Sequence, residues 1–130
     1  METRIVMKDF EIHSTPLEEI TIDASKIIIH LDDIMEERYR ISACPYQAFK
    51  ITTCDCFSVT TYHNDFCFRN GIYHTHILEI TNSIWIKELK NNLADECSTF
   101  LNEAKHYVFP LQENTIEFVA ASFEISRVDK

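Results

Sequence analysis

The chain of 130 residues contains one glycine, Gly71, although glycine usually makes up about 7% of a protein. Phosphate-binding loops, dinucleotide-binding turns and nucleophile elbows each need glycine at several positions, because only glycine tolerates the required dihedral angles or the close approach of a ligand. A chain with a single glycine lacks those signatures. The composition therefore argues against P-loop enzymes, Rossmann enzymes and α/β-hydrolases.

Length and composition indicate one domain over residues 1–130. Hydrophobic residues make up 45% of the chain and charged residues 25%, which is typical of a globular protein. Charged side chains interrupt the N-terminal segment, and the longest aliphatic run, residues 27–29, is far too short to cross a bilayer. We therefore expect a soluble cytoplasmic protein. In that compartment the five cysteines would stay reduced, most of them as buried thiols.

The chain carries a formal net charge of −9, from 21 acidic and 12 basic side chains. Such a charge repels nucleic-acid phosphates and attracts a basic protein surface, although solubility alone also explains it. Four carboxylates lie in one short segment, at Asp32, Asp33, Glu36 and Glu37. The functional interpretation of this segment is a docking patch for a basic partner. The alternative is a plain charged surface.

A hairpin and a helix have the clearest local signals. Asn70-Gly71 lies between β-forming runs and predicts a two-residue turn joining strands over 65–69 and 72–80, since both residues accept positive φ. At Asn82-Ser83 the apolar period changes from 2 to 3.6, and either residue suits an N-cap. An apolar stripe then predicts a helix over 83–96 whose buried residues are Trp85, Ile86, Leu89 and Leu93.

Strand-forming segments occupy much of the remaining chain. They cover residues 4–12, 20–31, 39–43, 47–53, 57–62, 105–111 and 115–128, and residues 31–39 fit either a short helix or an irregular connection. The last strand is apolar on both faces, which predicts a central strand with a helix on one side. The fold class is therefore α+β: a mostly antiparallel sheet of six to eight strands with one main helix. A two-sheet sandwich carrying the helix at one end is the alternative.

Two closely spaced pairs, His74/His76 and Cys54/Cys56, are the candidate metal ligands. On neighbouring strands each pair would project to one side, and together they could form a tetrahedral zinc site, with His63 as a substitute ligand. The spacing differs from the usual zinc knuckle. The competing interpretation places both histidines at the margin of the core, hydrogen-bonded to the backbone or to water. A cysteine nucleophile is disfavoured, because the thiols lie in strand-like segments without a nearby cation.

The leading functional hypothesis is a non-enzymatic interaction protein that binds, and in that way neutralises, a basic protein partner without a cofactor. In size and charge the chain is similar to small acidic β-rich proteins such as bacterial toxin-immunity proteins, and no motif carries this similarity. One alternative is a metal-binding domain or metalloenzyme that uses His74 and His76 with zinc. The other is a small apolar ligand bound in a curled sheet lined by Phe57, Phe66, Phe68 and Tyr73.

Overall fold

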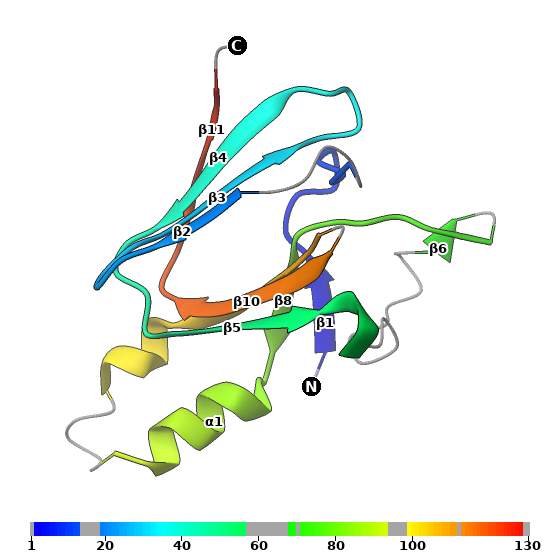
Figure 1. The fold of residues 1–130 in the computed structure, drawn as a ribbon. Coiled ribbons are helices and arrows are strands. Elements are labelled where there is room, and N and C mark those ends of the chain that lie inside the picture. The colour runs from blue at the N-terminus through cyan, green and yellow to red at the C-terminus, as the bar shows by residue number, and fades with distance from the viewer. Residues whose placement is uncertain are drawn as a thin grey trace.

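The computed structural model describes residues 2–13, 19–56, 68–69, 71–93, 99–111 and 113–128. Within these residues it contains nine strands in two antiparallel sheets, a separate short hairpin and one main helix (Figure 1). The α+β class predicted from the sequence is confirmed. The strands divide between two sheets, as in the sandwich that the sequence left as its alternative.

Five strands form the larger sheet, in the spatial order β1-β8-β9-β10-β5. Their bounds are β1 (Glu2–Ile5), β8 (Leu78–Thr81), β9 (Lys105–Pro110), β10 (Asn114–Ala120) and β5 (Ala48–Thr53). The smaller sheet has the order β11-β4-β3-β2. Its strands are β11 (Glu124–Arg127), β4 (Arg38–Ala43), β3 (Ile27–Asp32) and β2 (Glu19–Ile22).

The hydrophobic core lies between the two sheets. Alternate residues of β10, including Ile116 and Phe118, are fully buried and belong to the same cluster as Ile29 and Leu31 on β3. This follows from the period of two, which places every second side chain of a strand on one face. The Phe118 ring also stacks on that of Phe109 from β9, with centroids 5.3 Å apart. The inner face of β10 is thus the centre of the core.

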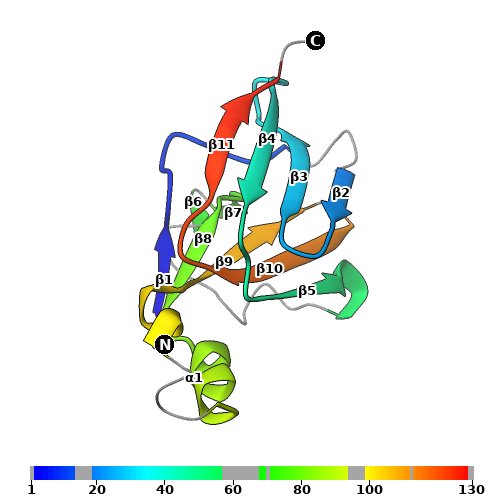
Figure 2. The same ribbon diagram turned by 90° about the vertical axis from the view of Figure 1, so that its left-hand side faces the viewer.

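The main helix, α1 (Ile84–Asn91), packs against the outer face of the larger sheet. There the Trp85 and His106 rings form a T-shaped pair with their centroids 5.1 Å apart. It begins after the predicted N-cap Ser83 and ends before the predicted Glu96. The apolar stripe is only half-buried, and Leu93 is 40% exposed, so the prediction that this stripe belongs to the core is wrong. Figures 1 and 2 show α1 at the end of the molecule away from the C-terminus.

Two predicted strands are interrupted. The segment 72–80 divides into β7 (Ile72–Tyr73) and β8, because the backbone between them bonds to the N-terminal segment, with Val6 N–H donating to Ile77 and Ile12 N–H to Thr75. The segment 115–128 divides into β10 and β11, which lie in different sheets. In both cases pairing with a distant strand overrides a local pattern that continues without a break.

The predicted hairpin turn has the expected register. Strand β6 (Phe68–Arg69) pairs with β7, Arg69 opposite Ile72, and Gly71 adopts a φ of 76°. This positive φ explains why the only glycine stands here. Asn70 and the predicted strand 57–62 lie outside the described residues.

No helix in the described part of the chain is both long enough and apolar enough to cross a membrane.

Replacing Phe118 by alanine tests the position of the core. Because Phe118 is fully buried among aromatic rings, Phe118→Ala should lower the free energy of unfolding by about 3–5 kcal/mol in urea titrations. Phe49 is the matched control, since it faces Phe118 across the β5–β10 ladder but is 39% exposed. Phe49→Ala should cost about 1 kcal/mol or less. Equal losses in the two variants would contradict this account of the core.

Candidate functional site

The predicted acidic patch spans the end of β3 and the loop to β4, and ion pairs engage its first and last carboxylates. Asp32 is 5% exposed, and Nη1 of Arg38 lies 3.2 Å from its Oδ1. Nη2 of Arg127 lies 2.8 Å from Oε2 of Glu37. The loop is therefore less acidic than the sequence alone indicates.

Hydrogen bonds hold the tip of this loop in one conformation. The Asp33 carboxylate accepts from the backbone N–H groups of Met35 (2.9 Å) and Glu37 (3.0 Å). The backbone N–H of Ile34 donates to the Glu11 carbonyl at 3.0 Å, which ties the tip to the N-terminal segment. The side chain of Asp33 thus takes the place of backbone partners, as aspartate commonly does in turns. The carboxylate holds the loop in shape, so it is not free as a docking group.

Two apolar side chains project from this ordered tip. Met35 is 76% exposed and Ile34 is 51% exposed, beside the exposed Glu36. For residues 31–39 the sequence left a short helix and an irregular connection open, and the structure shows an irregular turn between the two strands. Loop residues 33–37 therefore present an apolar pair next to carboxylates.

The structure gives each histidine of the predicted metal site a partner. Nδ1 of His74 lies 2.7 Å from Oε1 of Glu11, and Nδ1 of the fully buried His76 donates to the Phe10 carbonyl at 2.9 Å. Both residues lie in the irregular segment between β7 and β8 instead of within a strand. His76 bonds to the backbone, as the competing interpretation expected, but it is fully buried instead of marginal, and the partner of His74 is a carboxylate.

Cys54 and Cys56 belong to a 3₁₀ turn, η1 (Cys54–Cys56), instead of the predicted strand. This turn follows β5, and two strands separate β5 from β8. The thiol of Cys56 is exposed, as is that of Cys44, although most thiols were expected to be buried. Among the residues that the structure describes, no three His, Cys, Asp or Glu side chains lie close enough to hold a metal ion.

The remaining sequence-based candidates cannot be placed. His63, Phe57 and Phe66 lie outside the described residues, and only the backbone is described for Phe68 and Tyr73. The apolar ligand site therefore stays a prediction.

A buried chain of three polar side chains crosses the outer face of the larger sheet. Ser83 Oγ lies 2.7 Å from Nδ1 of His106, and Nε2 of His106 lies 2.8 Å from Oε1 of Glu117. The exposed fractions are 4%, 1% and 2%, respectively. Because a carboxylate only accepts, Nε2–H donates to Glu117, whereas the direction of the bond between Ser83 Oγ and Nδ1 depends on whether Nδ1 carries a proton. We call this array the Ser83–His106–Glu117 relay.

Neighbouring groups enclose the relay. Nζ of Lys50 lies 3.8 Å from Oε2 of Glu117 and 4.4 Å from the centroid of the Trp85 ring, which also packs against His106. The sequence analysis missed this arrangement, because its members come from the β8–α1 junction, β9 and β10. One signal was present: Glu117 is a charged residue inside a strand that is otherwise apolar on both faces. A buried carboxylate of this kind requires a partner.

The relay begins at a tight turn from strand to helix. Asn82, between β8 and Ser83, has a φ of 52°, in the left-handed region that asparagine tolerates better than most residues. Ser83 Oγ accepts from the backbone N–H of Ile86 at 3.3 Å, which confirms the predicted N-cap. The Ser83 oxygen therefore touches both the helix and His106.

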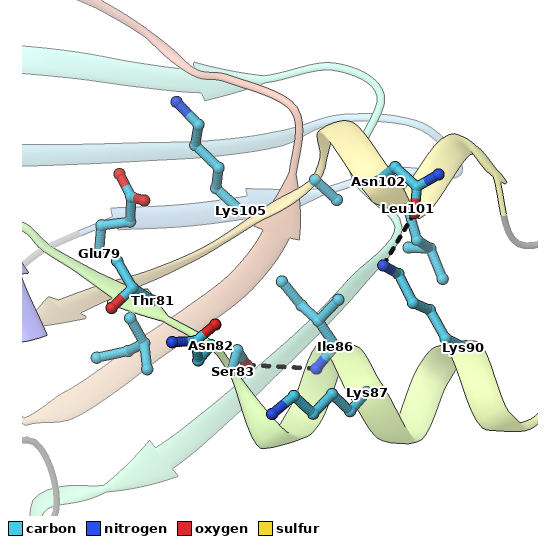
Figure 3. Close-up of a pocket in the computed structure, with 12 residues that line it drawn as sticks. Glu79, Thr81, Asn82, Ser83, Ile86, Lys87, Lys90, Leu101, Asn102 and Lys105 are labelled. Carbon is cyan, nitrogen blue, oxygen red and sulfur yellow. Dashed lines mark hydrogen bonds between the residues drawn. The ribbon is translucent and has the colours of Figure 1, made fainter. Parts of the chain in front are cut away.

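A pocket of about 350 Å³ opens beside Ser83 (Figure 3). It lies between α1, the end of β8 and the 3₁₀ turn η5 (Thr99–Glu103) with the start of β9. Three lysines line it, Lys87, Lys90 and Lys105, and Nζ of Lys90 donates to Oδ1 of Asn102 at 3.0 Å. This pocket is a basic feature of an acidic chain.

A partly exposed ion pair borders the pocket. The Arg4 guanidinium pairs with the Glu79 carboxylate, which also lines the pocket. Burial, and then the negative charge of Glu79, raise the pKa of the nearby Tyr107 hydroxyl above its ordinary value of 10.0, with Arg4 opposing them. The tyrosine is therefore held in its neutral form.

The raised pKa of Tyr107 predicts a loss of stability in alkali. The unfolded chain releases this proton at its ordinary pKa of 10.0, and the folded chain releases it only at higher pH. The neutral tyrosine therefore contributes to the free energy of unfolding in full below pH 10.0. That contribution is lost as the pH rises through the pKa of the folded state. Urea titrations from about pH 9 to about pH 11 should show a smaller loss for Tyr107→Phe than for the wild type. A Tyr107→Phe variant that loses as much stability as the wild type over this range would contradict the assignment.

Comparison of the chain with protein-family models, with curated proteins and with solved structures found no match in any of the three.

Proposed function

We propose that the protein binds a basic protein partner through loop residues 33–37, with Ile34 and Met35 as the apolar anchor. The observation that carries this proposal is the 76% exposure of Met35 on a loop whose backbone is fixed by hydrogen bonds. Exposed apolar side chains on an ordered loop are costly to keep in water unless another surface covers them.

The energetics of such a loop favour binding. A few well-placed side chains usually supply most of the affinity of an interface, and a loop that is already ordered loses little conformational entropy on association. The Asp33 carboxylate supplies that order. Methionine also adapts its shape to the surface it meets.

Charge has a different role from the apolar anchor. Ion pairs with Arg38 and Arg127 offset part of the negative charge of the acidic segment, whereas the whole chain carries −9. The field of the whole chain steers a basic partner and accelerates association, and the anchor slows dissociation. A field of this sign favours a cytoplasmic protein partner over nucleic acid. Neutralisation of the partner, as by immunity proteins, is the role that fits this charge.

Site-specific cross-linking tests the proposal. A photo-reactive phenylalanine analogue in place of Met35 should cross-link in cells to one basic protein. The same analogue in place of the exposed Ala24, in the β2–β3 turn at the other end of β3, should not. The cross-link at position 35 should be lost when Ile34→Ser is added. Equal cross-linking at both positions, an acidic partner or no adduct would count against the proposal.

Binding kinetics with the captured partner separate the two roles. Met35→Ser should raise the dissociation rate about 10-fold or more and leave the association rate nearly unchanged, because it removes apolar contact without removing charge. Salt raised from about 50 mM to about 500 mM should mainly lower the association rate. Ala24→Ser is the matched control and should change neither rate. A Met35→Ser variant with unchanged dissociation would show that the anchor lies elsewhere.

A further inference from the structure

The Ser83–His106–Glu117 relay contains the groups of a nucleophilic hydrolase and adjoins a pocket. We infer that Ser83 is a nucleophile for acyl transfer, with His106 as its general base, and that the pocket admits esters carrying a negative charge. This activity goes beyond the proposed partner binding and uses another part of the molecule. Figures 1 and 2 place the β3–β4 loop and α1 at opposite ends.

The partners of His106 match those that a serine nucleophile needs. A hydrolytic serine donates its proton to a neutral imidazole, and the other ring nitrogen donates to a carboxylate that fixes the tautomer. The distances of 2.7 Å and 2.8 Å place both contacts within hydrogen-bond range. In the tautomer that donates from Nε2 to Glu117, Nδ1 is the nitrogen that would take the serine proton, and either imidazole nitrogen can act as the base.

The backbone around Ser83 presents the nucleophile without glycine. Nucleophile elbows place serine on a sharp turn between a strand and a helix and use glycine to form that turn. This chain has the same order of strand, serine and helix, with β8 before Ser83 and α1 after it. Asn82 supplies the positive φ of 52°. The positive end of the α1 dipole begins at the next residue, where negative charge would develop on the attacked carbonyl oxygen. The lack of glycine signatures therefore does not exclude this chemistry.

The pocket determines which substrate could reach Ser83. Ser83 is one of its lining residues, and a volume of about 350 Å³ suffices for a small ligand. Lys87 and Lys90 line it from α1, and Lys105 lines it from the start of β9 (Figure 3). Among the lining residues that the structure describes, Glu79 is the one anionic side chain, and it is paired with Arg4. An ester that carries a carboxylate or phosphate group is therefore the favoured substrate class.

A purely structural role explains the relay less well. Capping α1 needs only an oxygen at position 83, because the cap is the acceptor for the backbone N–H of Ile86. His106 and Glu117 are 1% and 2% exposed, respectively. A protein in which well-packed apolar residues replace such a buried pair is often equally stable or more stable. A base and an orienting carboxylate aligned on one serine are a requirement of catalysis.

The reaction consists of two balanced transfers. Ser83 Oγ forms a bond to the ester carbonyl carbon while its proton passes to Nδ1 of His106, and Glu117 stabilises the resulting imidazolium. The ester C–O bond then breaks, and His106 returns the proton to the leaving alcohol. Water attacks the acyl-serine in the same way and releases the acid and free Ser83. The net change is the hydrolysis of one ester to one acid and one alcohol.

Covalent labelling is the first test. A fluorophosphonate, which phosphonylates activated serines with loss of fluoride, should modify the wild-type protein once, and peptide mass spectrometry should place the adduct at Ser83. Ser83→Gly is the matched control, because glycine keeps most of the capping preference and removes the hydroxyl. Circular dichroism and thermal unfolding establish that each variant is folded. A folded wild-type protein without an adduct at Ser83 would overturn the inference.

Ester hydrolysis is the second test and examines the charge of the substrate. The wild type should hydrolyse mono-p-nitrophenyl succinate with a larger kcat/KM than the neutral p-nitrophenyl butyrate, and Ser83→Gly should reduce both rates to background. Lys87→Gln with Lys105→Gln should lower kcat/KM for the anionic ester more than for the neutral ester and so abolish the preference. Equal rates on the two esters in the wild type would overturn the anionic substrate class. Hydrolysis that survives in Ser83→Gly would overturn the role of Ser83.

Glu117 acts through His106 and is a positioning residue. Glu117→Gln should lower kcat by about 100-fold or more with little change in KM, because it weakens the base without altering the pocket. It should also shift the pH at which kcat/KM reaches half its maximum. A folded Glu117→Gln variant with unchanged kcat and pH profile would remove Glu117 from the relay.

Discussion

Strand β10 must be buried on both faces, and the rest of the structure depends on how its two faces are covered. On one face Ile116 and Phe118 pack against the four-stranded sheet. Burial of these two side chains requires only apolar neighbours. The other face carries Glu117, whose buried carboxylate needs a hydrogen-bond donor. His106 on β9 supplies it, and the second nitrogen of that imidazole then engages Ser83 at the start of α1. The placement of the helix therefore follows from burying one carboxylate.

The fold separates the two candidate sites physically. The β3–β4 loop extends from the smaller sheet, and its order comes from the Asp33 carboxylate, so changes at Met35 leave the core untouched. The Ser83 pocket lies at the other end, on the outer face of the larger sheet (Figure 2). The loop is apolar with a residual negative charge, and the pocket is lined by three lysines. The two sites are thus suited to ligands of opposite charge.

Local signals in the sequence were reliable where the neighbouring residues decide the conformation. The hairpin turn at Gly71 and the N-cap at Ser83 were predicted because each depends on the dihedral angles or hydrogen bonds of a few adjacent residues. The acidic segment was identified as a group of carboxylates, but the exposure of Ile34 and Met35 beside it was not predicted. Whether Asp32 is free or paired depends on Arg38 across the hairpin, and sequence periodicity does not measure that contact.

The sequence by itself determined the α+β class, the start of the helix and the acidic character of the chain, because alternation, capping and composition are properties of short segments. Only the tertiary structure decided which strands share a sheet, where the long predicted strands break and which polar groups meet. Ser83, His106 and Glu117 come from three separate elements, and their contact exists only because β8, β9 and β10 pair in one register. That register is set by burial on both faces of the sheet, which no local pattern contains.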